Sequence, residues 1–270
     1  MRYLFANCKS LQSCDFIRKR TLLMIVCILL SGCRSPRADS GPSIEFSKIP
    51  QSEVGGPDKV SAIAKILQFS GYEWEVRQNP SPRGGVGNAY DAANAWTDAD
   101  GKLHLRIAKS AEGWSCAEVN LRRSLGYGSY LFVVHEIMRL EPAAVLGLYT
   151  WDDLNAAQNH QEMDIEISRW GDPVSKNAQY VIQPYYVPVN VFRFMSPHGG
   201  VTTHSFHWEP GRVSFRSTRG KSVVAEHVFT SGVPSPGSES VRMSFYVYGK
   251  TRTPLQNEAE VVIEKFEYLP

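Results

Sequence analysis

Cysteine is almost missing from most of this 270-residue chain. Four of the five cysteines lie within the first 33 residues, and only Cys116 follows them. This count excludes a disulfide-stabilised scaffold, so Cys116 is expected to be a small buried apolar side chain. Long apolar runs are also missing. A lasting transmembrane helix needs about 20 apolar residues, and the longest run, Thr21 to Leu30, has about half that length.

Net charge is also low, at a formal +2. The first 32 residues hold five basic and one acidic residue, which leaves the remainder at about −2. A nearly neutral body without a basic patch excludes nucleic acid as a partner. Gly-rich phosphate loops and a Gly-x-Ser-x-Gly elbow are absent. His204 and His207 would point to opposite faces of a strand, so we expect no metal and no cofactor.

The N-terminal segment has the features of an export signal. Arg18-Lys19-Arg20 precede the short apolar run, which ends at Leu30-Ser31-Gly32-Cys33. A basic stretch, a short apolar stretch and small residues are typical of a secretory signal. The last four residues resemble a bacterial lipobox, which implies cleavage before Cys33 and lipidation of Cys33. Because residue 34 is Arg, not Asp, we expect anchoring at the outer membrane or cell envelope. An ordinary signal peptide with an incidental Cys33 is the alternative.

The remaining chain divides into a flexible tether (33–43), an N-terminal extension (44–68) and a β-rich body (69–270). Residues 34–43 are rich in Arg, Ser, Pro and Gly, and residues 44–68 mix strand and helix signals. The body contains short alternating segments punctuated by Gly and Pro, without a convincing long amphipathic helix, which predicts an all-β sandwich. The expected strands are Tyr72–Arg77, Leu103–Ile107, Trp114–Arg122, Tyr127–Val134, Val145–Trp151, Glu162–Ile167, Gln179–Val189, Thr202–Trp208, Val213–Ser217, Met243–Val247 and Glu260–Tyr268.

One of these strands alternates acidic and apolar residues. Glu162, Asp164 and Glu166 share one parity, and apolar residues occupy the other. On a strand the three carboxylates would line one face while the apolar side chains enter a core. Like charges in a row repel, so stability does not favour the arrangement. The pattern alone leaves two readings open: a solvated acidic face, or a pair of carboxylates for glycoside hydrolysis.

The segment Glu162-Met163-Asp164-Ile165-Glu166 resembles the E-x-D-x-E motif of glycoside hydrolase family 16, the retaining β-glucanases. The resemblance implies a curved, concanavalin A-like jelly roll of two antiparallel sheets, with Glu162 as nucleophile, Asp164 as electrostatic helper and Glu166 as acid/base. Repulsion among the three predicts that Glu166 keeps its proton longest. Other landmarks of the family follow in order at Asp100–Leu105, Gly126–Tyr130, His204–Pro210 and Val261–Tyr268.

Substrate preference is predicted from the spacing and from nearby aromatics. One residue separates Asp164 from Glu166, as in lichenases and xyloglucan-active members, which indicates a β-1,3/1,4- or β-1,4-linked glucan. Sugar rings stack on aromatic side chains, and the candidates are Tyr149, Trp151 and Trp170. We expect a monomeric endo-acting hydrolase of polysaccharide. The alternatives are a transglycosylase and a non-catalytic carbohydrate-binding sandwich. Two departures from the family pattern are the glycine-poor loop 152–161 and a missing Trp at 244–248.

Overall fold

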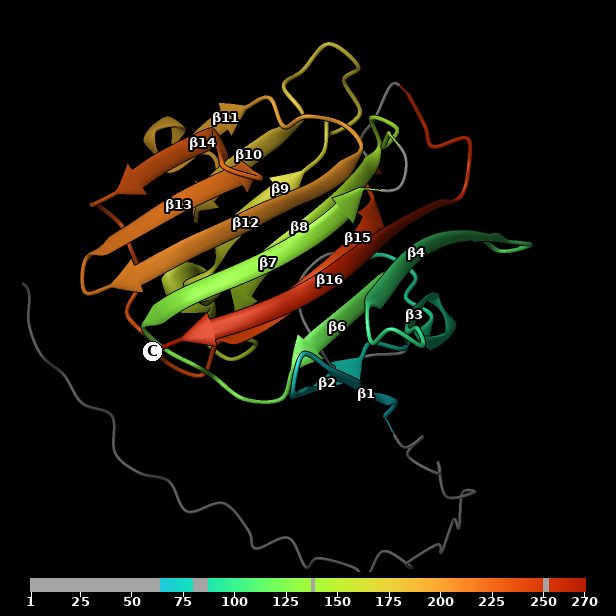
Figure 1. Ribbon diagram of the computed structural model, residues 1–270, viewed down its shortest axis with the longest axis horizontal. Helices are drawn as coiled ribbons and strands as arrows, with labels where there is room; N and C mark the ends of the chain where they lie inside the picture. Colours follow the sequence, from blue (N-terminus) through green and yellow to red (C-terminus); the bar gives the residue numbers. More distant parts are fainter. Residues whose placement is uncertain (1–63, 80–86, 137–138, 250–252) are drawn as a thin grey trace, which may run out of the picture. The chain divides into compact units, whose positions relative to one another are not determined.

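The computed structural model describes residues 64–79, 87–136, 139–249 and 253–270 (Figure 1). The chain divides into the units Met1–Asp58 and Lys59–Pro270, and all described residues belong to the second. The predicted signal, the lipobox with Cys33, the tether 33–43 and nearly all of the extension 44–68 therefore lie outside the described residues. Within the described part, no helix has the length and apolar character needed to cross a membrane.

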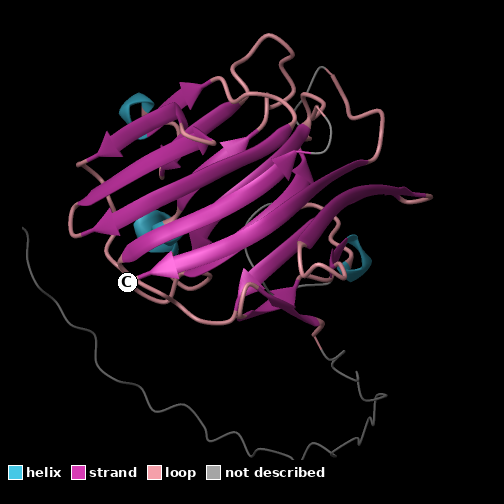
Figure 2. Ribbon diagram, viewed as in Figure 1, coloured by secondary structure: helices cyan, strands magenta, loops and turns pink. Residues whose placement is uncertain are grey.

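Two antiparallel sheets form the described unit, and in Figure 2 the second sheet lies in front of the first. The first sheet has the order β1 (Ile66–Phe69), β2 (Tyr72–Val76), β6 (Ala117–Leu121), β15 (Ser240–Val247), β8 (Ala144–Trp151), β9 (Met163–Ile167), β10 (Ala178–Ile182) and β11 (Val191–Phe194). The second has the order β14 (Ser222–Phe229), β13 (Arg212–Arg219), β12 (Gly200–Glu209), β7 (Gly128–Glu136), β16 (Ala259–Leu269), β4 (Leu103–Ser110) and β3 (Ala95–Thr97), with β5 (Gly113–Ser115) paired to β4.

Helical structure in the described residues is limited to three short 3-10 segments. They are η1 (Ala92–Asn94), η2 (Ala156–Gln161) and η3 (Pro188–Asn190). The segment η2 leads directly into Glu162 and β9, and η3 lies between β10 and β11.

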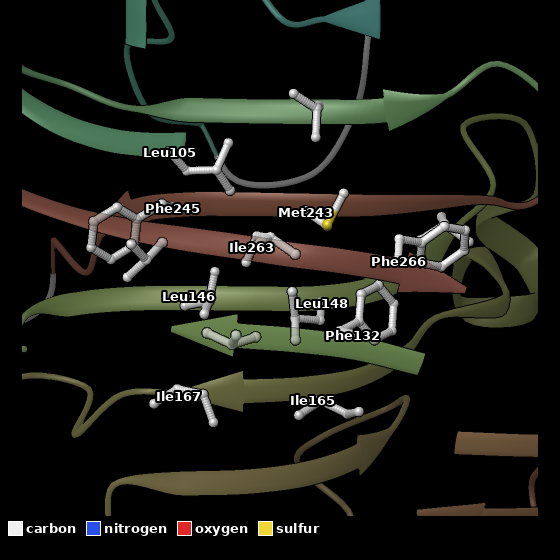
Figure 3. Packing of buried hydrophobic residues seen from close by; sticks show 14 of the residues in the cluster. Leu105, Phe132, Leu146, Leu148, Ile165, Ile167, Met243, Phe245, Ile263 and Phe266 are labelled. Atoms are coloured by element: carbon white, nitrogen blue, oxygen red, sulfur yellow. The ribbon is translucent and has the colours of Figure 1, made fainter. Parts of the chain in front are cut away.

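The core fills the space between the two sheets. Figure 3 shows Ile165 and Ile167 of β9 on the same side as the apolar residues of β8 and β15. Across from them lie side chains of the second sheet, among them Phe132, Ile263 and Phe266. Full burial of such a side chain contributes roughly 1.5–3 kcal/mol. This burial sets the register of β9 and directs its even-numbered residues to the other side of the first sheet, here called the outer face.

The architecture confirms the predicted all-β sandwich of two antiparallel sheets. Several predicted strand limits are wrong. The expected strand Gln179–Val189 ends at Ile182, because Pro184 and Pro188 have no N–H for a ladder bond. The expected Trp114–Arg122 is split into β5 and β6. The strands β1, β3, β11 and β14 were not predicted.

Candidate active site

The three carboxylates lie together on the outer face of the first sheet. Strand β9 runs between β8 and β10, so the motif is in the interior of the sheet and not at an edge. Asp164 and Glu166 are on β9, and Glu162 immediately precedes the strand. Met163, Ile165 and Ile167 are buried in the core on the opposite side. The predicted alternation of carboxylates and apolar side chains is therefore present in the structure.

Glu162 and Asp164 form a hydrogen-bonded pair of carboxyl groups. Such a contact between two acids requires a shared proton. Burial is the largest cause that raises the pKa of each group, and the nearby carboxyls raise the pKa of Asp164 further. Gln183 contacts both residues. Its side-chain Nε2 donates to Asp164 Oδ2 over 3.3 Å, and its backbone N–H donates to the Glu162 carbonyl over 3.2 Å.

Glu166 is surrounded by hydrogen-bond donors. Gln179 Nε2 donates to its Oε2 over 2.5 Å, and the Tyr246 hydroxyl donates to its Oε1 over 3.2 Å. The Trp170 side chain provides a third hydrogen bond. Arg193 Nε donates to Gln179 Oε1 over 3.1 Å, so Gln179 links the positive charge of Arg193 to Glu166. Burial raises the pKa of Glu166, whereas these donors oppose the rise.

This environment adds burial and hydrogen bonding to the repulsion from which the protonation order was predicted. The prediction placed the last proton on Glu166; burial does raise the pKa of Glu166, and the donors around it limit that rise. Burial also raises the pKa of Glu162 to about 8, and the hydrogen bond between the two groups lowers the pKa of Glu162 and raises that of Asp164, so the proton of the pair rests on Asp164. Repulsion between like charges is only one of several contributions, and side chains from neighbouring strands supply the others.

The backbone just before Glu162 is strained. Asn159, His160 and Gln161 have φ values of 50°, 57° and 52°, in the left-handed region that non-glycine residues rarely occupy. Each such residue costs on the order of 1 kcal/mol, so surrounding contacts must hold the conformation. The Asp152 N–H donates to the His160 carbonyl over 2.7 Å, and Gln161 Nε2 donates to the Ser235 carbonyl over 2.7 Å. The glycine-poor loop therefore presents Glu162 in a fixed position.

Trp151 lies at the end of β8, beside this loop. Its ring is stacked on His160 with centroids 4.0 Å apart and planes 9° apart. Its indole Nε1 donates to Asp153 Oδ1 over 3.2 Å. The half-buried ring also lines a pocket of about 510 Å³ on the side of β15 and β6, together with Asn120, Arg122 and other polar residues. Arg242 also lies over the ring, 5.6 Å from its centroid, and the role of Trp151 as a platform for a sugar ring stays a prediction.

Tyr149 has a different environment from the one predicted. Only 7% of its surface is exposed, and its hydroxyl donates to Glu118 Oε2 over 3.3 Å. Glu118 also pairs with Arg77 over 3.0 Å and with Arg242 over 3.7 Å, and all three charged side chains are buried. The structure thus shows Tyr149 in a buried polar network beneath the site, with little surface left for a sugar.

Trp170 lies against Glu166 but is also covered from one side. Arg193 is stacked over its ring at 4.7 Å from the centroid, and Trp170 itself has a φ of 45°. The ring is half-buried and forms a hydrogen bond with Glu166. Trp170 therefore lies beside the carboxylates, as predicted, and contacts Glu166, whereas its stacking on a sugar ring stays a prediction.

Sequence reasoning missed the partners of the carboxylates. Gln179 is directly opposite Glu166 in the register of β10 and β9, a neighbour that the alternation Gln179, Val181, Gln183 could have indicated. Tyr246 could not be found in this way, because it comes from β15, on the far side of β8. Arg242 was also missed, and its charge lowers the pKa of Glu162.

The described residues contain no group of three His, Cys, Asp or Glu side chains that could hold a metal ion. His204 is buried and bonded to Ser217, whereas His207 is about half exposed. Cys116 is a buried free thiol, as predicted. The outer face of the described first sheet presents carboxyl groups, amides and the Tyr246 hydroxyl.

Comparison with known proteins shows the same fold in solved β-glucanases. A β-glucanase of Bacillus licheniformis superimposes with a TM-score of 0.60 and 15% identity, over 77% of this chain and 98% of that chain. A prokaryotic β-1,3-1,4-glucanase (lichenase) from a mouse hindgut metagenome gives 0.58 and 16%, over 73% and 92%. A pseudo β-1,3-glucanase and immunostimulatory antigen of Mycobacterium tuberculosis gives 0.53 and 15%, over 71% and 88%. No family model matches the sequence, and no curated protein matches it.

Proposed function

We propose that this protein is a retaining, endo-acting glycoside hydrolase of family 16 that cleaves a β-1,3/1,4- or β-1,4-linked glucan. The main support is one observation: Glu162, just before the interior strand β9, lies with Asp164 and Glu166 of that strand on one side of the sheet, and Glu162 and Asp164 share a hydrogen bond. A solvated acidic face would leave the side chains apart and exposed. The fold of solved β-glucanases supports the same class of substrate.

The roles follow from the chemistry of retaining hydrolysis. Glu162 attacks the anomeric carbon while Glu166 protonates the leaving glycosidic oxygen, which breaks the C–O bond and leaves a glycosyl ester on Glu162. Glu166 then takes a proton from water, and the water oxygen displaces Glu162. Asp164 keeps the shared proton and donates its hydrogen bond to the Glu162 carboxylate. The donors around Glu166 stabilise the ionised form that exists between the two steps.

A non-catalytic carbohydrate-binding sandwich is the second candidate. One of the structural neighbours is called a pseudo β-1,3-glucanase. The same sandwich fold therefore also occurs in a protein that bears this name. Three carboxyl groups held close together would serve no purpose in simple sugar binding, because their repulsion opposes ionisation. A transglycosylase would use the same two steps with a sugar hydroxyl in place of water.

The deciding experiment is hydrolysis of barley mixed-linkage β-glucan, xyloglucan and a pure β-1,3-glucan. We expect activity on the first or second, lost in Glu162→Gln and kept in Glu226→Gln, an exposed acid on the other sheet. Release of transfer products in place of reducing ends would indicate a transglycosylase. Unchanged activity in Glu162→Gln, or exclusive cleavage of the β-1,3-glucan, would contradict the proposal.

The two roles are separated with azide. Glu166→Ala should still cleave substrates with an activated leaving group, and azide should restore turnover to a glycosyl azide of retained configuration. Glu162→Ala should lose retaining chemistry, and azide should then give the inverted glycosyl azide. The reverse pattern would exchange the roles of Glu162 and Glu166.

We also propose that the mature protein is anchored through a lipid on Cys33. The support is the Leu-Ser-Gly-Cys motif after a basic and apolar segment. Cys33→Ala should move the protein from the membrane fraction to the soluble fraction while urea unfolding of the sandwich stays unchanged. Wild-type protein found entirely in the periplasm or medium would exclude the anchor.

A further inference from the structure

The connection between β10 and β11 exposes several large apolar side chains. Tyr185 and Tyr186 are 67% and 75% exposed, and Val189 is 76% exposed. The two tyrosine rings are 6.0 Å apart between centroids and inclined by 74°. Exposed aromatic side chains that lie close together on a soluble protein indicate a binding surface more often than single exposed apolar residues do.

This connection is attached directly to the carboxylates. The Gln183 backbone N–H donates to the Glu162 carbonyl, and the Gln183 side-chain amide donates to Asp164. The Oε1 of the same amide accepts the Tyr185 backbone N–H over 2.8 Å. One amide group therefore separates the backbone of Tyr185 from the Asp164 carboxyl group.

The connection is also held in one conformation. The Val187 and Asn190 N–H groups donate to the Pro184 and Val187 carbonyls over 3.2 and 2.9 Å. Asn190 Nδ2 donates to the Pro184 carbonyl over 3.3 Å, and Pro188 occupies the start of η3. A loop that is ordered before binding loses little conformational entropy when a ligand arrives.

The chemistry of this surface selects an uncharged partner. Residues 181–192 contain no Asp, Glu, Lys, Arg or His. Aromatic rings stack on the apolar faces of sugar rings, whereas a charged polymer would find no counter-charge in this segment. An exposed tyrosine pair next to carboxyl groups that act on sugars suits a neutral polysaccharide chain.

We propose that Tyr185 and Tyr186 form a second sugar-binding platform for the neutral β-glucan chain, on the β10 side of the carboxylates. Trp151 lies on β8, on the other side of β9, so the chain would contact aromatic side chains on both sides of Glu162. The inference rests on the proposed function and deepens it. Binding on both sides of the cleavage point requires an internal stretch of polymer, which is the requirement of an endo-acting enzyme.

The test measures binding in the Glu162→Gln background, so that hydrolysis does not interfere. Affinity for barley mixed-linkage β-glucan is measured by affinity electrophoresis and calorimetry. Tyr185→Ala/Tyr186→Ala should weaken binding at least tenfold, whereas Tyr185→Phe/Tyr186→Phe should stay within threefold, because Phe keeps the stacking face. Val223→Ala removes an exposed apolar side chain on β14 and should change nothing. In the active enzyme, the Ala pair should raise KM for the polymer by a larger factor than it lowers kcat.

Several outcomes overturn the platform. Equal affinity of the Ala pair and its parent excludes it, and so does absence of any binding by the Glu162→Gln parent. A dimer in size-exclusion chromatography that the Ala pair abolishes would show that a second copy occupies this surface. The proposed function can fail independently. Binding that depends on the tyrosines without any hydrolysis would support the platform and contradict the hydrolase. Hydrolysis that depends on Glu162 without any effect of the tyrosines would support the hydrolase and contradict the platform.

Discussion

The Tyr246 hydroxyl contacts Glu166 across an intervening strand, with a hydrogen bond of 3.2 Å to Oε1. Tyr246 is on β15 and Glu166 on β9, and β8 runs between them. The residue of β8 paired with Glu166 is Gly147, which has no side chain. A Cβ at Gly147 would come within 3.2 Å of Ser244 Oγ and 3.4 Å of the Tyr149 ring. The small residue and the tyrosine together complete the environment of Glu166.

Replacing Tyr246 with Phe should therefore change how Glu166 titrates. Loss of the donor raises the pKa of Glu166, because the hydrogen bond favours the ionised form. We expect the alkaline limb of the kcat/KM profile to move to higher pH and kcat to fall about tenfold, equivalent to about 1.4 kcal/mol. Tyr248→Phe, two residues further along, serves as the control. A profile that moves to lower pH would contradict this account of Glu166.

Glu162→Gln should stabilise the fold at neutral pH. The pKa of Glu162 is raised to about 8 in the folded protein, above its ordinary value of 4.5. Such a group contributes stability that is present below pH 4.5 and lost as the pH rises through 8. The neutral amide avoids that loss, so we expect a gain on the order of 2 kcal/mol at pH 7.5 and almost none at pH 4. Urea unfolding at both pH values is the measurement.

Glu226→Gln provides the comparison for this experiment, because Glu226 is exposed. It should leave stability unchanged at both pH values. An equal gain for Glu162→Gln at pH 4 and pH 7.5 would show that the effect comes from packing and not from the ionisation of Glu162.

His204 should make the protein sensitive to acid. It is 2% exposed on β12, its Nδ1 lies 2.7 Å from Ser217 Oγ, and burial lowers its pKa to about 4. Below pH 6.5 His204 takes up a proton in the unfolded chain but stays neutral in the folded chain. The free energy of unfolding therefore falls as the pH drops from 6.5 to 4. The loss should approach roughly 3 kcal/mol.

Comparison with His204→Phe isolates this contribution, since other acid-sensitive groups are shared by both proteins. As the pH falls, the free energy of unfolding of the wild type should decrease relative to that of His204→Phe. His207→Gln, at a half-exposed position on the same strand, should follow the wild type. Parallel curves for wild type and His204→Phe would refute the prediction.

Arg242→Met should be strongly destabilising. Arg242 is fully buried, with Nη2 at 2.7 Å from Asp153 Oδ2 and Nη1 at 3.7 Å from Glu118 Oε1. Removing one partner of a buried ion pair leaves the other charge poorly compensated, which costs about 3–5 kcal/mol. Lys265→Met, in the exposed pair with Glu267, should cost at most about 1 kcal/mol. Similar unfolding midpoints for the two variants would rule out a structural role for the Arg242 network.

The sequence alone was sufficient for the features that depend on local alternation. Strand period is a property of consecutive residues, so the order Glu162, Met163, Asp164, Ile165, Glu166 already predicts one acidic and one apolar face. Short alternating segments between Gly and Pro likewise predicted an all-β sandwich, and the resemblance to family 16 implied its two antiparallel sheets. The error at Gln179–Val189 was avoidable, because Pro184 and Pro188 are incompatible with a paired interior strand.

Only the tertiary structure decided which side chains surround those carboxylates. Tyr246 is separated from Glu166 by 80 residues and reaches it because β15 and β9 flank the same strand. Tyr149 and Trp151 have the same parity on one strand, yet one is buried against Glu118 and the other lines a pocket. Their difference arises from what covers each position on the sheet. Strand order and loop placement are set by the burial of the whole core, a long-range property that no local pattern of residues contains.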